Sequence, residues 1–227
     1  MSALFLGRAR LRRDAAAAAL APLLVPQGEN ARTSAAHRLV WALFADDPER
    51  RRDFLWREES PGALMTLSSR PPSDPHGLFE LDFKSFAPAL AAGDRLGFRL
   101  RANPTVSRSA GPGKRGARHD VVMDALHRTS DTSRADARPE AVIQAGRAWL
   151  AAQGTRHGFT PDAGVAVDAY DQLRLPRPGG APLRYSVVDF EGLLTVHDPA
   201  AFLPALATGF GRAKAFGCGL MLIRRAR

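Results

Sequence analysis

The apolar residues of this chain recur at two spacings, one typical of a helix and the other of a strand. In the range 34–44 they follow the spacing of a single helix face, which predicts a helix. In the range 95–101 they occupy every second position, which predicts a strand with one buried face. The other face of this strand carries Arg99 and Arg101. We therefore expect an apolar core on one side of the strand and cationic side chains on the other.

Shorter patterns indicate further elements in the first half of the chain. A strand is expected over residues 4–11, and Asp14 after it is a suitable N-cap for a helix in the following run of alanines. A proline and a glycine separate two short extended segments, 54–58 and 63–69, as in a hairpin. With a weak helix before the strand at 95–101, the first half reads strand, helix, strand, strand, weak helix, strand.

The second half predicts a helix at 139–153, strands at 164–175 and 184–196, a helix at 199–208 and a strand at 219–223. The second of these helices has clear ends, because Asp198 is a suitable N-cap, Pro199 favours the first helical position and Gly209 follows the last. Both halves approximate the βαββαβ unit of ferredoxin-like folds. The expected fold class is α+β, with two tandem ferredoxin-like domains.

Residues 105–138 differ in composition from the segments around them. They are rich in Ser, Gly, Arg and Asp, and they include the basic run SRSAGPGKRGARHD. This composition predicts a mobile basic loop that leads into a linker. The expected division is an N-terminal domain at 1–104, the basic loop and linker at 105–138, and a C-terminal domain at 139–227.

The composition is that of a globular protein with a marked positive charge. The 227 residues are 45% hydrophobic, which is ordinary for a globular core. Lys and Arg number 32 against 23 Asp and Glu, and the net charge of +9 attracts polyanions such as nucleic acid or an anionic membrane surface. A basic protein from an arginine-rich proteome would show the same surplus. Apolar runs are too short for a membrane span, so we expect a cytoplasmic protein with no membrane partner.

The cysteine and histidine residues do not form a metal-binding pattern. Cys218 is the single cysteine, which excludes an internal disulfide framework and a cysteine-based zinc cluster. His119 and His127 are eight residues apart, and His157 and His197 stand alone, without an HExxH motif. We therefore expect no metal and no other cofactor.

A glycine-rich run, GFGRAKAFGCG, occupies residues 209–219. Its glycines permit close backbone approach to a phosphate chain, and Arg212 and Lys214 add charge where backbone amides could form an anion nest. The run follows a predicted helix and enters a predicted strand, the reverse of the order in a nucleotide-binding P-loop. A flexible connection between the two elements is the alternative interpretation.

Four segments together resemble the CasE family of type I-E CRISPR-associated RNA endonucleases. The segments are HRLVWALF at 37–44, FRLRANP at 98–104, VDFEGLLTV at 188–196 and GFGRAKAFGCGLMLIRR at 209–225. They occur in the order of the family. The resemblance implies two ferredoxin-like domains that bind a CRISPR repeat hairpin in precursor RNA, cleave it at the base of the stem and retain the product as a subunit of the Cascade complex.

The resemblance also assigns candidate catalytic residues. The family's catalytic histidine corresponds to His37, which taken alone would more often be a packed helix residue. RNA supplies its own nucleophile, the 2′-hydroxyl, so His37 as general base or acid and Lys214 or Arg212 as a charge stabiliser would suffice without a metal. The family often has a tyrosine where this chain has Ser34, three residues before His37 on the same helical face, so Ser34 is also a candidate catalytic residue. Tyr170 and Tyr185 are too remote in the sequence to be assigned as its substitutes.

Basic and glycine residues are the candidate RNA contacts. Lys114, Arg115 and Arg118 are expected to bind the phosphates of the hairpin, because duplex RNA is recognised mostly by shape and backbone. A solvated disordered loop is the alternative for these three. The remaining predicted contacts are Arg99, Arg101, Arg212, Gly209, Gly211, Gly217 and Gly219. Two other functions are considered: a repeat-RNA-binding subunit without catalysis, and a small-molecule or regulatory ferredoxin-like protein.

Overall fold

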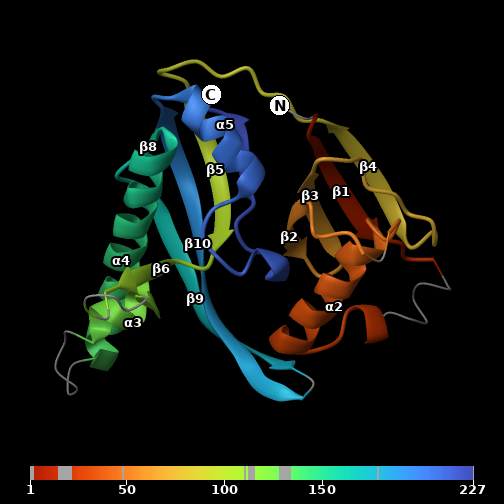
Figure 1. Cartoon of the computed structure of the whole chain (residues 1–227), viewed down its shortest axis with the longest axis horizontal. Helices are drawn as coiled ribbons and strands as arrows, with labels where there is room; N and C mark the ends of the chain where they lie inside the picture. The colour runs from red at the N-terminus through yellow and green to blue at the C-terminus, as the bar shows by residue number, and fades with distance from the viewer. Residues whose placement is uncertain are drawn as a thin grey trace.

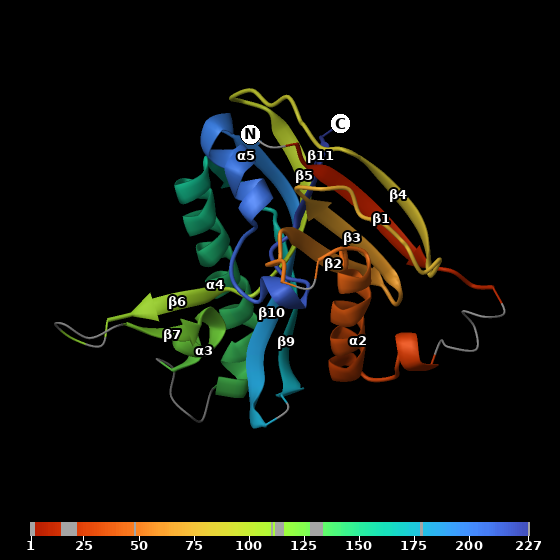
Figure 2. The same ribbon diagram turned by 45° about the vertical axis from the view of Figure 1, so that its right-hand side comes forward.

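The computed structural model describes residues 3–14, 22–47, 49–109, 111, 116–127, 134–177 and 179–226. It has an α+β fold built on antiparallel sheets (Figures 1 and 2). The strands are β1 (Phe5–Leu11), β2 (Phe54–Ser60), β3 (Ala63–Ser68), β4 (Phe79–Ser85), β5 (Arg95–Ala102), β6 (Thr105–Arg108), β7 (Ala117–Asp120), β8 (Phe159–Pro161), β9 (Ala166–Arg177), β10 (Gly180–Val196) and β11 (Met221–Arg225). The helices are α2 (Glu29–Ala42), α3 (Val121–Leu126), α4 (Arg134–His157), α5 (Pro199–Thr208) and the short 3-10 helix η2 (Lys214–Phe216).

The first sheet has the strand order β2-β3-β1-β4, and each neighbouring pair is antiparallel. Helix α2 is packed on this sheet, because Ala36, Leu39 and Val40 share one apolar cluster with Trp56 and Phe79. The predicted helix around His37, the strand over β1 and the β2–β3 hairpin are confirmed. Helix α2 begins earlier than predicted, at Glu29.

Two features of the first half differ from the sequence prediction. The weak helix expected before β5 is wrong, since residues 69–78 and 86–94 are described and contain no helix. Strand β4 was not predicted, although Phe79, Leu81 and Phe83 alternate with polar residues, and of these three only Phe79 is buried. The helix expected after Asp14 falls on alanines that lie outside the described residues.

The second sheet has the order β11-β5-β10-β8, with β9 also paired to β10. Its main apolar cluster joins residues of β5, α4, β10 and α5, among them Phe98, Trp149, Phe190 and Phe202. The strands and helices predicted for the second half are confirmed. Asp198 caps α5 as expected, because its side chain accepts the backbone N–H groups of Ala200 and Ala201.

Strand β5 belongs to the second sheet, whereas the sequence prediction grouped it with the first half. Leu100 lies opposite Phe190 of β10 on one side and Met221 of β11 on the other. The apolar face of β5 is buried in the cluster of the second sheet, so its periodicity predicts the strand correctly but not its partners. The chain therefore passes from the first sheet to the second between β4 and β5, whereas the sequence analysis grouped all residues up to 104 together.

The described residues of the segment 105–138 contain strands and helices where a loop and linker were predicted. Strands β6 and β7 form an antiparallel hairpin, and α3 follows directly. Asp120 caps α3 by accepting the N–H groups of Val122 and Met123, while Val121, Val122 and Leu126 are buried. Local capping and burial thus explain why these residues fold, and α4 begins at Arg134, inside the segment predicted as a linker.

The glycine-rich run lies between the two halves of the molecule. Its helix η2 contacts both α2 and β2, and Figures 1 and 2 show this turn beside α2. Residues that are far apart in the sequence thus meet at one place, with α2 on one side and η2 on the other.

Candidate active site

His37 projects from α2 toward η2 and is held by a backbone carbonyl of the glycine-rich run. Its Nδ1 lies 2.6 Å from the oxygen of Ala215, and Trp56 Nε1 donates to the same oxygen at 3.1 Å. A carbonyl oxygen can only accept, so Nδ1 carries the hydrogen and Nε2 of the neutral ring keeps a lone pair. The contact therefore fixes the tautomer in which Nε2 can accept a proton.

Aromatic rings surround the imidazole. The ring of Phe216 is 5.3 Å from that of His37, and the ring of Trp41 is 6.5 Å away. Tyr185 stacks on Phe216 with a centroid distance of 5.6 Å. The fold thus brings Tyr185, which is remote in the sequence, within one ring of His37.

Burial lowers the pKa of His37 below its ordinary value of 6.5. The hydrogen bond to Ala215 opposes this shift, and the charges of Arg52 and Arg38 add to it. Desolvation disfavours the charged imidazolium, and nearby cations do the same. At neutral pH the ring is consequently in its neutral form, which is the form a general base requires.

Lys214 and Arg212 lie in the same loop but in different environments. Lys214 is half-buried and donates from Nζ to the carbonyl of Thr208 at 2.7 Å. Burial and the charge of Arg52 lower the pKa of Lys214. Arg212 has an exposed side chain, and its backbone N–H donates to the oxygen of Asn103. The structure places Lys214 in the loop turn that holds His37, with Arg212 at the rim.

The glycines shape the loop more than they expose its amides. Gly217 has φ +80°, and a Cβ there would lie 3.3 Å from the ring of Trp56. Gly219 has φ +93°, is buried, and donates its N–H to the carbonyl of Arg101. These two positions require glycine for conformation and close packing. Gly209 and Gly211 are half-buried.

Ser34 turns its hydroxyl back to its own helix. Its Oγ donates to the carbonyl of Asn30 at 3.0 Å, one turn earlier. Among the hydrogen bonds between described residues, none joins Ser34 to His37. Their common helix therefore brings them near each other without a hydrogen bond between their side chains.

The other predicted RNA contacts do not gather around His37. Arg99 forms an ion pair with Glu59 at 2.8 Å, and Arg101 forms one with Asp189 at 2.9 Å. Arg118 is exposed on β7, which Figure 2 shows on the opposite side of β9 and β10 from α2. Lys114 and Arg115 lie outside the described residues.

Two side chains at the site were missed by the sequence prediction. Trp56 shares the Ala215 carbonyl with His37, and the charge of Arg52 acts on both His37 and Lys214. Trp56 has the apolar surroundings of any buried strand residue, and Arg52 is one of several arginines in a row. Only the three-dimensional arrangement distinguishes them.

Neither a metal cluster nor a membrane helix is found in the part of the chain that the structure describes. Within these ranges no three His, Cys, Asp or Glu side chains come together as a group that could hold a metal ion. No described helix is both long and apolar enough to cross a membrane.

Comparison with known proteins finds similarity over nearly the whole chain. The sequence model of a family described as "CRISPR associated protein" matches residues 4–225. The chain belongs to the Cse3/CasE family. A Cse3/CasE relative from Thermus thermophilus, a CRISPR-associated endoribonuclease Cse3, is 34% identical over 150 residues, which are 62% of this chain and 60% of that protein. The CRISPR system Cascade subunit CasE of Escherichia coli K12 is 25% identical over 82% of this chain and 88% of its own length.

Solved structures of Cse3 show the same fold. A CRISPR endoribonuclease Cse3 bound to a 19-nucleotide RNA matches with a TM-score of 0.68 and 28% identity over 99% of both chains. Thermus thermophilus Cse3 bound to an RNA that represents a pre-cleavage complex matches with a TM-score of 0.67 and 26% identity, over 98% of this chain and 99% of its own. Both comparisons cover the two sheets and the loop between them.

Proposed function

We propose that this protein is a metal-independent endoribonuclease that binds a CRISPR repeat hairpin and cleaves it at the base of the stem. The mature RNA would then stay bound, with the protein as a subunit of Cascade. The observation that carries the proposal is the hydrogen bond from His37 Nδ1 to the Ala215 carbonyl, which leaves Nε2 as a proton acceptor. Relatives named as a CRISPR endoribonuclease and as a Cascade subunit support it.

The proposed reaction needs one base, one acid and a stabilised phosphate. His37 Nε2 removes the proton of the 2′-hydroxyl, and the 2′-oxygen attacks the adjacent phosphorus. The bond to the 5′-oxygen breaks, and that oxygen takes a proton from a water molecule as it leaves. The products are a 2′,3′-cyclic phosphate upstream and a 5′-hydroxyl downstream.

Lys214 and Arg52 are the cations proposed to stabilise the phosphate in the transition state. Lys214 Nζ has three hydrogens and uses one for Thr208, so two remain for phosphate oxygens. Cations in a partly desolvated site stabilise developing negative charge more strongly than they would in water. Both side chains are half-buried, as this role requires.

The wider RNA surface would use the β6–β7 hairpin and the basic residues near it. Arg118 is exposed on β7, and Lys114 and Arg115 precede it in the sequence. A projecting basic hairpin can follow the phosphates of an RNA stem, whose deep major groove restricts side-chain access. Arg99 and Arg101 are instead engaged with carboxylates, so their proposed contact with RNA requires exchange of those ion pairs.

We also propose that the fold is a tandem of ferredoxin-like units. The first unit is β1-α2-β2-β3-β4, in which β3 lies between β1 and β2 in the sheet. The second is β5-α4-β9-β10-α5-β11, in which β10 lies between β5 and β9. Both are split βαβ arrangements. The boundary between the units would then lie between β4 and β5, and the first unit would lack its second helix.

The decisive experiment is an assay of a labelled repeat hairpin with the protein in excess EDTA. We expect cleavage, an upstream product with a cyclic phosphate or its hydrolysed form, and a downstream 5′-hydroxyl. Strict dependence on magnesium, or a 5′-phosphate product, would contradict the mechanism. Tight binding without cleavage would favour the alternative of a non-catalytic RNA-binding subunit, which the absence of tyrosine at Ser34 makes a real second candidate.

A further inference from the structure

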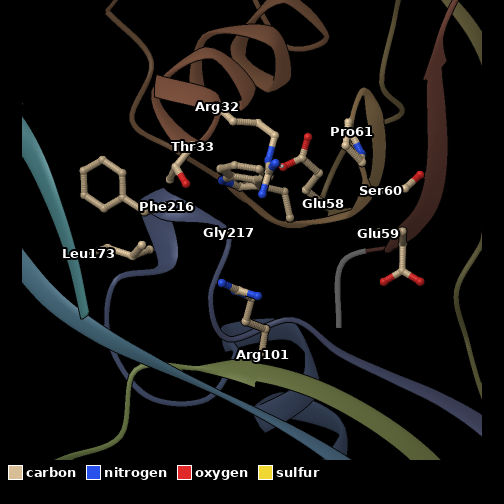
Figure 3. Close-up of a pocket in the computed structure, with 11 residues that line it drawn as sticks. Arg32, Thr33, Glu58, Glu59, Ser60, Pro61, Arg101, Leu173, Phe216 and Gly217 are labelled. Atoms are coloured by element: carbon tan, nitrogen blue, oxygen red, sulfur yellow. Dashed lines mark ion pairs between the residues drawn. The ribbon is translucent and has the colours of Figure 1, made fainter. Parts of the chain in front are cut away.

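A cavity of about 230 Å³ lies beside the candidate active site, between α2, the end of β2 and the glycine-rich loop. Its walls include Arg32, Thr33, Glu58, Arg101 and Phe216. Figure 3 shows these side chains arranged around a common space, with Arg32 and Thr33 from α2 on one side and Arg101 on another. No step of the proposed cleavage uses this cavity.

The cavity and His37 share one aromatic wall. Trp56 lines the cavity and donates to the same Ala215 oxygen that holds His37. Phe216 also lines the cavity, and its ring lies 5.3 Å from the imidazole. A nucleotide with its phosphate at His37 would therefore have the cavity within reach of its base.

The charges in the walls favour a neutral polar group over a phosphate. Arg32 faces Glu58, with Nε 3.6 Å from Oε2, and Glu59 is paired with both Arg57 and Arg99. Carboxylates in the wall would repel a phosphate, and the polar lining disfavours a purely apolar ligand. A nucleobase meets both conditions, because it is neutral and flat and carries hydrogen-bonding groups on its edge.

Glu58 is a wall residue with unused acceptor capacity. Its Oε1 accepts the Gly62 N–H at 3.1 Å, and a carboxylate has about four acceptor sites. Burial raises the pKa of Glu58, and the Gly62 hydrogen bond and the Arg32 charge oppose this shift. The carboxylate is thus poorly hydrated, so a donor from a ligand would replace little water.

We propose that this cavity binds the base of the unpaired nucleotide directly downstream of the cleaved bond, and that it prefers a purine with an amino group. The inference rests on the proposed cleavage at the base of a hairpin, where the upstream nucleotide is held in the stem and the downstream one is free to be extruded. Phe216 and the Arg32 guanidinium supply surfaces for stacking, and Glu58 accepts from the amino group.

The test compares single-turnover cleavage of hairpins that differ only at this nucleotide, which is adenosine, purine riboside, uridine or an abasic site. Purine riboside keeps the ring system of adenine and lacks its amino group, so it isolates the contact with Glu58. We expect wild-type protein to cleave the adenosine hairpin about tenfold faster than the uridine and abasic ones, given the usual contribution of base stacking. The purine riboside hairpin should be cleaved at a rate between these two.

Variants then assign the preference to the cavity. Glu58→Gln keeps an acceptor for Gly62 and should make the cleavage rates of the adenosine and purine riboside hairpins equal. Glu80 is exposed on β4, so the control variant Glu80→Gln should leave the difference between these two rates unchanged. Equal wild-type rates on all these hairpins would overturn the inference and leave the proposed function standing. Failure to cleave any of them would overturn both.

Discussion

At the scale of single residues, His37 is defined by contacts that its own helix does not supply. The Ala215 carbonyl sets its tautomer, and burial and two arginines set its pKa. His37→Ala should lower the single-turnover cleavage rate by roughly 10²- to 10⁴-fold, the usual contribution of a general acid or base, and leave hairpin binding unchanged. The same substitution at His76, which is exposed, is the matched control. Equal loss of binding and cleavage would make His37 a structural residue.

The pH dependence of cleavage follows from the direction of the His37 pKa shift. A general base acts in its neutral form, so the rate should fall with decreasing pH, with a midpoint below 6.5. Arg52 lowers this pKa, so Arg52→Gln should move the midpoint to higher pH. Arg51→Gln, the neighbouring exposed arginine, should leave it in place. Rate profiles of the three proteins at saturating protein concentration provide the measurement.

Ser34 provides the test of the departure from the family pattern. Its hydroxyl is bonded to Asn30, and it could reach the scissile phosphate only through water. Ser34→Ala should slow cleavage modestly, by less than His37→Ala. Ser34→Tyr should preserve folding, since the position is only half-buried, and its rate could exceed that of the wild type. A Ser34→Tyr protein that unfolds would mean that the side chain faces the core.

At the scale of elements, the glycine-rich loop works through its conformation. Gly217→Ala places a side chain at φ +80° and against Trp56, so it should reduce stability by roughly 1–2 kcal/mol from the backbone alone and weaken cleavage. Gly77→Ala is the control, because Gly77 also has positive φ but nothing lies within 4 Å of the added Cβ. Thermal unfolding of both variants separates backbone strain from crowding. An equal loss of stability in the two variants would exclude a packing role for Gly217.

The sequence predicted where strands and helices lie better than it predicted which strands pair. The alternation in β5 and the cap and glycine around α5 depend on neighbouring residues, and both elements were found where expected. The pairing of β5 with β10 and β11 depends on which sheet buries Phe98 and Leu100, and a one-dimensional pattern does not contain that choice. Strand β4, at the edge of the first sheet, was missed although Phe79, Leu81 and Phe83 alternate with polar residues.

The candidate site also combines features that the sequence indicates with features that it does not. His37 and Lys214 are candidates through the family resemblance, and the structure brings their elements, α2 and η2, together. Trp56 could not be assigned, because its role depends on a carbonyl that lies 159 residues further along the chain. Backbone groups carry no signature in the side-chain sequence, so Ala215 could not be predicted as the partner of the histidine.

At the scale of the whole molecule, the positive charge should govern RNA affinity. With a net charge of +9, binding to the hairpin should release counterions, and log affinity should fall linearly with log salt. Arg118→Gln should reduce the magnitude of the slope by roughly 0.7 to 0.9, the contribution of one phosphate contact. Arg50→Gln should change the slope less, because Arg50 already forms ion pairs with Asp46 and Asp47. Fluorescence titrations between low and moderate salt would measure the slopes, and a flat response would contradict the basic surface.

The carbonyl of Ala215 has a consequence for the exchange of parts between relatives. The histidine comes from the first sheet's helix, and the group that orients it comes from the second half of the chain. A chimera that joins β1–β4 of this protein to β5–β11 of a distant relative could fold both units and still misplace the imidazole. We therefore expect recombination within this family to be constrained where η2 meets α2 and β2, even when each half folds correctly.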